Sequence, residues 1–286
     1  MVNVLFVTFD SLRWDVFEAA HVPFLKSLGA WKKAYTQGTF TLPAHMAFYM
    51  GKLPQAVDGT DYYDSSPTRI LPDGRLTRRT QLWGLVGTEA SRFQHPGRTL
   101  LQGESIIHGY RKRGYLTLGT GAVNWFNPQT PAGRHLSRPF HRFRFFAEDG
   151  FSFRESAPSQ VAWVEKESRR SRRFFRRRPV FAFVNFGETH HPFTYRGCSW
   201  DRTSNPYGNQ KSCLERQQRC FEYLDAYAER LVSALEPCDL VLCADHGEAL
   251  GEDGLWGHGF FHRKVMEVPL LIRPAKKPVP VTEEGM

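Results

Sequence analysis

Apolar residues concentrate in short runs that predict the strands of a buried sheet. The runs span residues 3–9, 115–119, 179–186, 240–243 and 268–272. Each is almost continuously apolar and shorter than an ordinary helix, which is typical of strands covered on both faces in a parallel sheet.

Amphipathic spacing predicts helices between these strands. The clearest lies at residues 212–235, where apolar side chains recur every three, four or seven positions, and residues 159–173 show a similar pattern. Shorter helices are predicted at residues 22–28 and 44–50, each followed directly by a glycine. Strands that alternate with helices predict an α/β fold, with a doubly wound, mostly parallel sheet and helices on both faces.

The length of 286 residues is sufficient for one large domain with a full core. We expect a single domain over residues 1–275 and a charged tail at 276–286. Residues 58–109 are rich in glycine, proline, arginine and threonine, and we predict that they form an irregular excursion from the sheet. The chain contains no internal repeat and no glycine- or serine-rich linker, so a second domain is not expected.

The net charge of +9 would be compatible with nucleic-acid binding, but much of the excess lies in one run from Arg169 to Arg178. Neither zinc-finger spacing nor an aromatic RNA-binding motif accompanies the run, so no sequence-specific nucleic-acid partner is expected. We interpret the run as a basic face for an anionic substrate, an anionic membrane surface or a protein partner. A plain solvated helix end is an equally good reading.

The sequence predicts a cytoplasmic protein. The apolar residues after Met1 lack a basic segment before them and a cleavage site after them, so they predict a strand and not a signal peptide. No apolar stretch approaches the ~20 residues of a membrane span. The five cysteines show no CxxC spacing and are expected to be reduced. A disulfide among Cys198, Cys213 and Cys220 is the alternative.

Side chains that bind metals follow three of the predicted strands. Because parallel strands deliver their carboxyl ends to one edge of a sheet, these groups should converge there. Carboxylate and imidazole ligands together favour Zn²⁺ or Mn²⁺, as one or two ions. The residues concerned are Asp10, then Glu188, His190 and His191, then Asp245 and His246, with His258 shortly after.

Thr41 should lie just before the N-terminus of a helix, because Pro43 suits the first turn. Free N–H groups and the helix dipole at such a position favour phosphate or a developing anion. Beside a metal, the Thr41 hydroxyl would become a nucleophile for an anionic ester. Without that context, Thr41 would be read as an ordinary helix cap.

Four motifs in order carry a resemblance to a known family. They are FVTFDSLRWD at residues 6–15, TLPAH at 41–45, THHPF at 189–193, and ADHGE at 244–248 with GHG at 257–259. The chain resembles the alkaline phosphatase superfamily from residue 4 to about residue 272. The most similar branches are the sulfatases and the lipid phosphoethanolamine transferases.

The resemblance implies roles for individual residues. Asp10, Thr41, Asp245 and His246 match the first metal site of the family, with Thr41 in the position of the nucleophile. His190 and His258 match histidines that bind substrate or help to hold a second metal, and they are also candidate catalytic groups. His45 and Lys264 match positions that contact the substrate or the nucleophile. Glu248 and Glu252 are expected only to order their loop.

The chain departs from the family pattern in informative ways. Sulfatases carry cysteine or serine at the nucleophile, because its Cβ is oxidised to an aldehyde. Thr41 carries a methyl group there and cannot yield that aldehyde. Ser11 replaces the second aspartate of calcium-type sulfatases, which again favours Zn²⁺ or Mn²⁺. The chain is short, so the smaller C-terminal subdomain of sulfatases should be reduced or absent.

These observations favour a metal-dependent hydrolase of small anionic phosphate esters, acting through a covalent phosphothreonine at Thr41. Three alternatives stay open at this point. The first is transfer of a phospho-group, such as phosphoethanolamine, to an acceptor hydroxyl. The second is hydrolysis of sulfate esters. The third is a non-catalytic binding protein on the same fold. Neither the substrate nor the oligomeric state can be read from the sequence.

Overall fold

The computed structural model describes residues 1–51, 104–146, 155–174 and 178–275. Most of the predicted excursion at 58–109 and the tail at 276–286 lie outside these residues. At its end the excursion was predicted too long, because residues 106–109 are helical and belong to α5 (Ile106–Lys112). The structure does not test the rest of the excursion, the tail, or the boundary placed at residue 275.

A seven-stranded sheet forms the centre of the molecule, in the order β2-β9-β6-β1-β5-β3-β4. Five adjacent strands, from β6 to β4, are parallel, whereas β9 runs antiparallel to both of its neighbours. The predicted α/β fold with a mostly parallel sheet is confirmed, although the sequence did not predict the two short edge strands, β2 and β4. The strands are β1 (Asn3–Phe9), β2 (Lys32–Tyr35), β3 (Leu116–Gly121), β4 (Arg142–Phe145), β5 (Val180–Phe186), β6 (Cys238–Ala244) and β9 (Glu267–Arg273).

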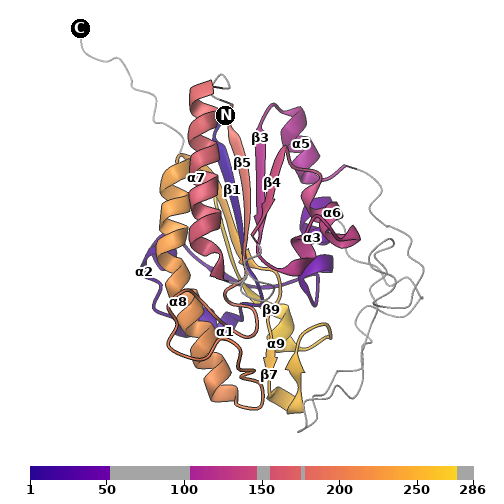
Figure 1. The fold of residues 1–286 in the computed structure, drawn as a ribbon, viewed down its shortest axis with the longest axis vertical. Helices are drawn as coiled ribbons and strands as arrows, with labels where there is room; N and C mark the ends of the chain where they lie inside the picture. Colours follow the sequence, from indigo (N-terminus) through magenta and orange to yellow (C-terminus); the bar gives the residue numbers. More distant parts are fainter. Residues whose placement is uncertain (52–103, 147–154, 175–177, 276–286) are drawn as a thin grey trace.

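Helices cover both faces of the sheet (Figure 1). One face carries α1 (Trp14–Ala19), α2 (Pro23–Ser27), α7 (Ala157–Phe174) and α8 (Gln210–Leu235). The other carries α3 (Thr41–Met50), α5 (Ile106–Lys112) and α6 (Pro131–Ser137). The remaining short elements are η1 (Asn124–Phe126), β7 (Ala249–Leu250), η3 (Glu252–Gly254), β8 (Trp256–Gly257) and α9 (Arg263–Met266).

Alternation along β1 explains why its run is apolar throughout. Leu5 and Val7 are buried in the core beneath α7 and α8, whereas Val4 and Phe6 are buried in the core beneath α3 and α5. Successive side chains of a strand point to opposite faces, so a strand with a core on each side needs apolar residues at every position.

The apolar stripe predicted at residues 212–235 becomes the buried face of α8. Phe221 on this stripe meets Phe9 of β1 edge to face, with ring centroids 5.1 Å apart. The helix begins at Gln210, because the Asn209 side chain accepts a hydrogen bond from the Ser212 N–H at 3.0 Å. The long helix thus anchors the central strand that leads to Asp10.

The carboxyl ends of β5, β1 and β6 lie side by side. Phe9 pairs with Phe186 on one side and with Ala244 on the other. The residues that follow these strands therefore emerge at the same edge of the sheet, as the sequence predicted for the metal-binding side chains.

The described part of the basic run, Arg169 to Phe174 and Arg178, lies at the opposite edge, where the parallel strands begin. Arg169 and Arg170 are exposed at the end of α7, and Arg178 precedes β5. The Arg178 guanidinium donates to the carbonyl oxygens of Gly114 and Tyr115 just before β3. This placement separates the described part of the run from the strand ends that carry Asp10 and Asp245. Contact with an anionic surface stays a prediction.

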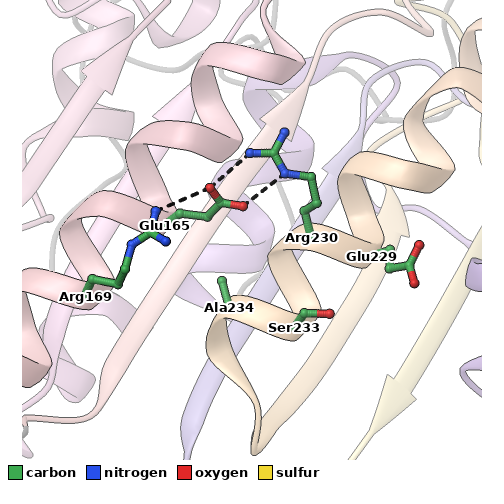
Figure 2. A pocket seen from close by; sticks show the side chains of 6 residues that line it. All are labelled: Glu165, Arg169, Glu229, Arg230, Ser233 and Ala234. Carbon is green, nitrogen blue, oxygen red and sulfur yellow. Dashed lines mark hydrogen bonds and ion pairs between the residues drawn. The ribbon is translucent and has the colours of Figure 1, made fainter.

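A cavity of about 480 Å³ lies between α7 and α8, next to Arg169 (Figure 2). Both of its arginines are engaged by Glu165, whose carboxylate accepts two hydrogen bonds from Arg230 and lies 3.6 Å from the Arg169 guanidinium, and a second carboxylate, that of Glu229, also lines it. The cavity is therefore a poor site for an anion.

All five cysteines are free thiols, and only Cys198 is not fully buried. Among the helices of the described ranges, none combines the length and the apolar character needed to cross a bilayer. The cytoplasmic location stays a prediction.

Candidate active site

Two buried carboxylates and an imidazole meet at the carboxyl edge of the sheet. Asp10 follows β1, while Asp245 and His246 follow β6, and all three side chains are inaccessible to solvent. The His246 Nε2 atom lies 3.7 Å from Asp10 Oδ1 and 3.6 Å from Asp245 Oδ2. The ligand atoms of the three residues lie within 4.8 Å of one another, a suitable spacing for one shared cation.

Hydrogen bonds from the surrounding chain orient the two carboxylates. Asp245 Oδ1 accepts from the N–H groups of Ser11 at 3.1 Å and His246 at 2.9 Å. Ser11 reaches this position in a left-handed conformation, with φ of 62°. Asp10 Oδ2 accepts from the Asn185 side-chain amide at 3.2 Å. Asp10 Oδ1 also accepts from the Ser11 hydroxyl at 3.3 Å, so the protein holds both oxygens of Asp10 and one oxygen of Asp245.

Two atoms of the cluster are buried without a hydrogen-bond partner in the described residues: Asp245 Oδ2 and His246 Nε2. Buried polar atoms are nearly always satisfied, and these two face each other as an oxygen and a nitrogen ligand would face a cation. The donor set fits a divalent cation, as the sequence predicted, and the choice of Zn²⁺ or Mn²⁺ stays a prediction.

Burial strongly affects the protonation of these groups. Burial and the neighbouring Asp245 charge raise the pKa of Asp10 to about 7, and burial raises the pKa of Asp245 to about 7. Burial lowers the pKa of His246 to about 4, which keeps its ring neutral and able to coordinate a metal. Two buried carboxylates so close together favour a cation that would compensate both charges.

Thr41 opens α3 and points its hydroxyl at the cluster. The hydroxyl is buried and donates to Asp10 Oδ2 at 3.4 Å. The helix begins at Thr41, three residues earlier than predicted, because Pro43 is accommodated within the first turn, where its missing N–H costs nothing. Thr41 is therefore the first helical residue and not the one before the helix. The predicted end at Gly51 is confirmed by its left-handed φ of 64°.

His45 lies one turn further along α3 and contacts the main chain of Thr41. Its Nδ1 lies 2.7 Å from the Thr41 carbonyl oxygen, and its Nε2 lies 3.1 Å from the Thr8 hydroxyl. The ring is fully buried, and burial lowers its pKa to about 3. Both nitrogens thus contact the protein, so His45 holds the start of α3 in place. A contact between His45 and the ester or the nucleophile stays a prediction.

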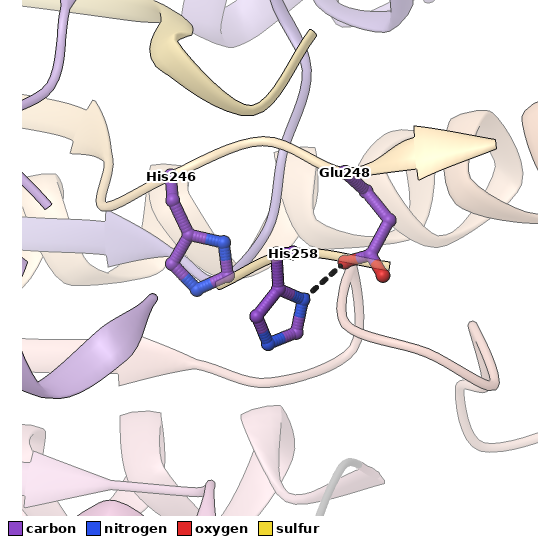
Figure 3. A group of neighbouring side chains, drawn as sticks. All are labelled: His246, Glu248 and His258. Atoms are coloured by element: carbon purple, nitrogen blue, oxygen red, sulfur yellow. Dashed lines mark hydrogen bonds and ion pairs between the residues drawn. The ribbon is translucent and has the colours of Figure 1, made fainter. Parts of the chain in front are cut away.

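His258 and Glu248 form a second group beside the first (Figure 3). His258 Nδ1 lies 2.8 Å from Glu248 Oε2, and the His258 ring centroid lies 4.4 Å from that of His246. Burial opposes charge on both partners, but their mutual attraction prevails, so the pKa of Glu248 is lowered and that of His258 is raised. The His190 ring lies 5.2 Å from His258, so the two predicted catalytic histidines are neighbours.

Two residues of the site were missed in the sequence. Glu248, expected only to order its loop, is fully buried and could join His246 and His258 around a second ion. Its spacing of two from His246 was the available signal. Asn185, which donates to Asp10, was missed because it lies within a strand predicted from its apolar residues. The signal that could have identified it is that it is the one polar residue of that strand.

Lys264 is engaged in a network between loops. Its Nζ lies 2.6 Å from Asp15 Oδ2, and Asp15 also pairs with the buried Arg13 at 2.7 Å. Arg13 reaches on to Glu252 at 2.7 Å, so the network ties the loop after β1 to the loop after β6. A contact between Lys264 and substrate stays a prediction.

Gly247, between His246 and Glu248, packs tightly against the start of α9. A Cβ atom at Gly247 would lie 2.1 Å from the Lys264 carbonyl oxygen. We expect Gly247→Ala to displace this loop, to lower the free energy of unfolding by about 1–3 kcal/mol and to weaken metal binding. Denaturant titration with and without Mn²⁺ measures both effects. Gly109→Ala in α5 is the control, because nothing lies within 4 Å of its Cβ position; equal stability of the two variants would contradict the prediction.

The sulfatase family model matches residues 87–285, which is more than half of the chain. The chain belongs to the sulfatase family. The matched residues include Asp245, His246, His190 and His258. Asp10 and Thr41 precede the match, so their assignment in this sulfatase-family protein rests on the motifs and on the geometry described above.

The chain is also similar to a curated sulfatase. A choline-sulfatase from Rhizobium meliloti is 22% identical over 330 residues, which cover 94% of this chain and 62% of the relative. The sulfatase-family chain thus spans less than two thirds of that relative's length.

Two solved structures share the fold. A protein of the alkaline phosphatase superfamily from Vibrio parahaemolyticus has a TM-score of 0.59 at 15% identity, covering 96% of this chain and 60% of its own. The C-terminal periplasmic domain of EcEptC from Escherichia coli, in complex with Zn, has a TM-score of 0.62 at 13% identity, covering 96% and 73%. The expected resemblance to the alkaline phosphatase superfamily is confirmed.

Proposed function

We propose that this sulfatase-family protein hydrolyses small phosphate esters with the help of a divalent cation, through a phosphothreonine intermediate at Thr41. The observation that carries the proposal is the position of the Thr41 hydroxyl. It lies at the N-terminus of α3 and donates to Asp10, within a buried cluster of two carboxylates and a neutral imidazole.

Asp10, Asp245, His246 and the Thr41 oxygen would hold the cation. When bound, a divalent cation would lower the pKa of the threonine hydroxyl and neutralise charge on the transferring group. The unpartnered Asp245 Oδ2 and His246 Nε2 atoms support this role, since a cation would satisfy both.

The protein's own groups would divide the reaction into two steps. In the first, the Thr41 hydroxyl passes its proton to its acceptor, Asp10 Oδ2, and Oγ1 forms a bond to phosphorus while the bond from phosphorus to the leaving alcohol breaks. His258 would protonate that alcohol, because the Glu248 carboxylate overcomes the effect of burial and raises the His258 pKa. In the second step, water gives a proton to His258 and attacks phosphorus, and the bond from phosphorus to Thr41 Oγ1 breaks. Thr41 takes back the proton from Asp10, and inorganic phosphate is released. The free N–H groups at the start of α3 favour the negative charge of the phosphoryl oxygens.

The identity of the nucleophile favours phosphate over sulfate esters. The Cβ atom of Thr41 carries a methyl group and cannot be oxidised to the aldehyde that sulfatases use. A threonine hydroxyl can still attack phosphorus directly, as hydroxyl nucleophiles do in covalent catalysis.

The proposal is tested by incubating purified protein with phosphate monoesters, phosphodiesters, phosphonate esters and sulfate esters in Mn²⁺ or Zn²⁺. We expect release of inorganic phosphate that stops when a chelator is added. Phosphate that appears on a second alcohol would indicate a transferase, and release of sulfate alone would indicate a sulfatase. If the protein binds no metal and is inactive on every ester, it is a non-catalytic binding protein, and the proposal is contradicted.

A further inference from the structure

Tyr207 links two loops at the candidate active site, although it lies far in sequence from every motif. Its hydroxyl donates to Glu248 Oε1, while the other Glu248 oxygen accepts from His258 Nδ1 at 2.8 Å. Glu248 is therefore held by one donor on each carboxylate oxygen, and one of those donors is the ring that we assign as the acid.

We infer that Tyr207 is a positioning residue for His258, acting through Glu248. The inference rests on the proposed role of His258 in protonating the leaving group. A carboxylate fixed at both oxygens has one orientation, which keeps Oε2 directed at His258 Nδ1. That contact places the Nδ1 proton between the two residues and leaves Nε2 as the nitrogen available for the reaction.

The Tyr207 ring is braced in a way that suits this role. The His191 ring packs on it with centroids 4.1 Å apart, and the Trp256 ring packs on it at 5.5 Å. The Asn205 side-chain oxygen contacts His191 Nε2 at 2.7 Å and accepts from the Tyr207 N–H at 3.0 Å. The hydroxyl is thus delivered to Glu248 from a rigid support, at little cost in conformational entropy when it makes its hydrogen bond.

This arrangement assigns functions to residues that the proposed reaction does not otherwise use. His191 belongs to the THHPF motif, and Trp256 forms β8, just before His258. Both contact Tyr207 and not the Asp10 cluster in the described contacts. The segment that follows β5 therefore contributes to the site twice: directly through His190, and through Tyr207 by way of Glu248.

The test is Tyr207→Phe, which removes the hydroxyl and keeps the ring between His191 and Trp256. The matched control is Tyr227→Phe, which removes a hydroxyl that bonds Tyr223 on α8 at 3.1 Å, away from the site. Both variants are compared with the unaltered protein, loaded with Mn²⁺, on a series of phosphate esters whose alcohols differ in pKa.

The dependence of kcat on the pKa of the leaving alcohol distinguishes a loss of His258 positioning from a general loss of activity. Alkyl phosphates need a proton on the departing alcohol, whereas 4-nitrophenyl phosphate does not. We expect Tyr207→Phe to lower kcat on alkyl phosphates by about 10-fold or more, with a clearly smaller loss on 4-nitrophenyl phosphate. Tyr227→Phe should match the unaltered protein on both. Equal losses on all esters, or no loss on any, would overturn the inference.

A second readout does not require turnover. Nitrogen-15 NMR of the histidine rings reports which nitrogen of His258 carries the proton. At a pH where the His258 ring is neutral, we expect a single Nδ1–H form in the unaltered protein and in Tyr227→Phe, and a mixture of Nδ1–H and Nε2–H forms in Tyr207→Phe. An unchanged His258 spectrum in Tyr207→Phe would overturn the inference. A protein that is inactive on every phosphate ester would instead contradict the proposed function, and the NMR result would still decide the role of Tyr207.

Discussion

Thr41→Ala should lower the turnover of phosphate esters by on the order of 10³-fold or more, because alanine offers no oxygen to form the covalent intermediate. Thr41→Ser should keep measurable activity, since serine retains the hydroxyl that donates to Asp10. Steady-state kinetics on 4-nitrophenyl phosphate measures both variants. Acid quenching during turnover, followed by mass spectrometry, should locate a phosphate group on the peptide that contains Thr41.

The side chain of Thr41 is small and contributes little to the core, so Thr41→Ala should fold normally. Circular dichroism and Mn²⁺ binding provide the check that the loss is chemical and not structural. Full turnover by Thr41→Ala, or a phosphate group trapped on another residue, would rule out the threonine mechanism.

Metal should stabilise the protein more strongly at pH 8 than at pH 5.5. In the metal-free protein, the folded-state pKa of Asp10 and of Asp245 is about 7, against an ordinary value of 3.8. The folded state therefore keeps protons that the unfolded state releases, so stability from these groups falls as pH rises from about 4 to about 7. A cation takes the place of those protons, and its binding strengthens over the same range.

Thermal unfolding with and without Mn²⁺ at the two pH values measures this effect. At a free metal concentration 100 times the dissociation constant, binding stabilises the folded state by about 2.7 kcal/mol. A gain that is the same at both pH values, or larger at pH 5.5, would contradict the assignment of these carboxylates as ligands.

The variant Asp245→Asn tests the same effect by removing one of the two buried negative charges. Its side-chain oxygen can still accept from the N–H groups of Ser11 and His246, while the buried negative charge is lost. We expect the metal-free variant to be more stable than the unaltered protein at pH 8 and to gain almost no stability from Mn²⁺. Asp239→Asn, at a partly exposed position earlier on β6, is the control and should keep the full metal response.

The accuracy of the sequence-based predictions varied from one part of the chain to another. The central strands and α8 were predicted because burial of their side chains requires apolar residues at regular positions. That pattern is visible in the sequence. The edge strands β2 and β4 were missed because they are short and their residues are largely not buried, so they carry no such pattern. The start of α3 was misplaced because the helix was predicted to begin after Pro43, whereas Pro43 lies within a first turn that begins at Thr41.

The order of residues was sufficient to place Asp10, Asp245 and His246 at one edge of a parallel sheet, because strands of one direction end together. It was also sufficient to identify Thr41 as the nucleophile candidate, through its motif. Which oxygens and nitrogens face each other was decided by folding. The contacts of Asn185 with Asp10 and of Tyr207 with Glu248 join segments that are remote in the chain, and the contact of Glu248 with His258 spans the segment that contains β7 and β8. Such contacts depend on the exact path of the loops and on side-chain rotamers. Neither produces a periodic pattern of residues in a single sequence.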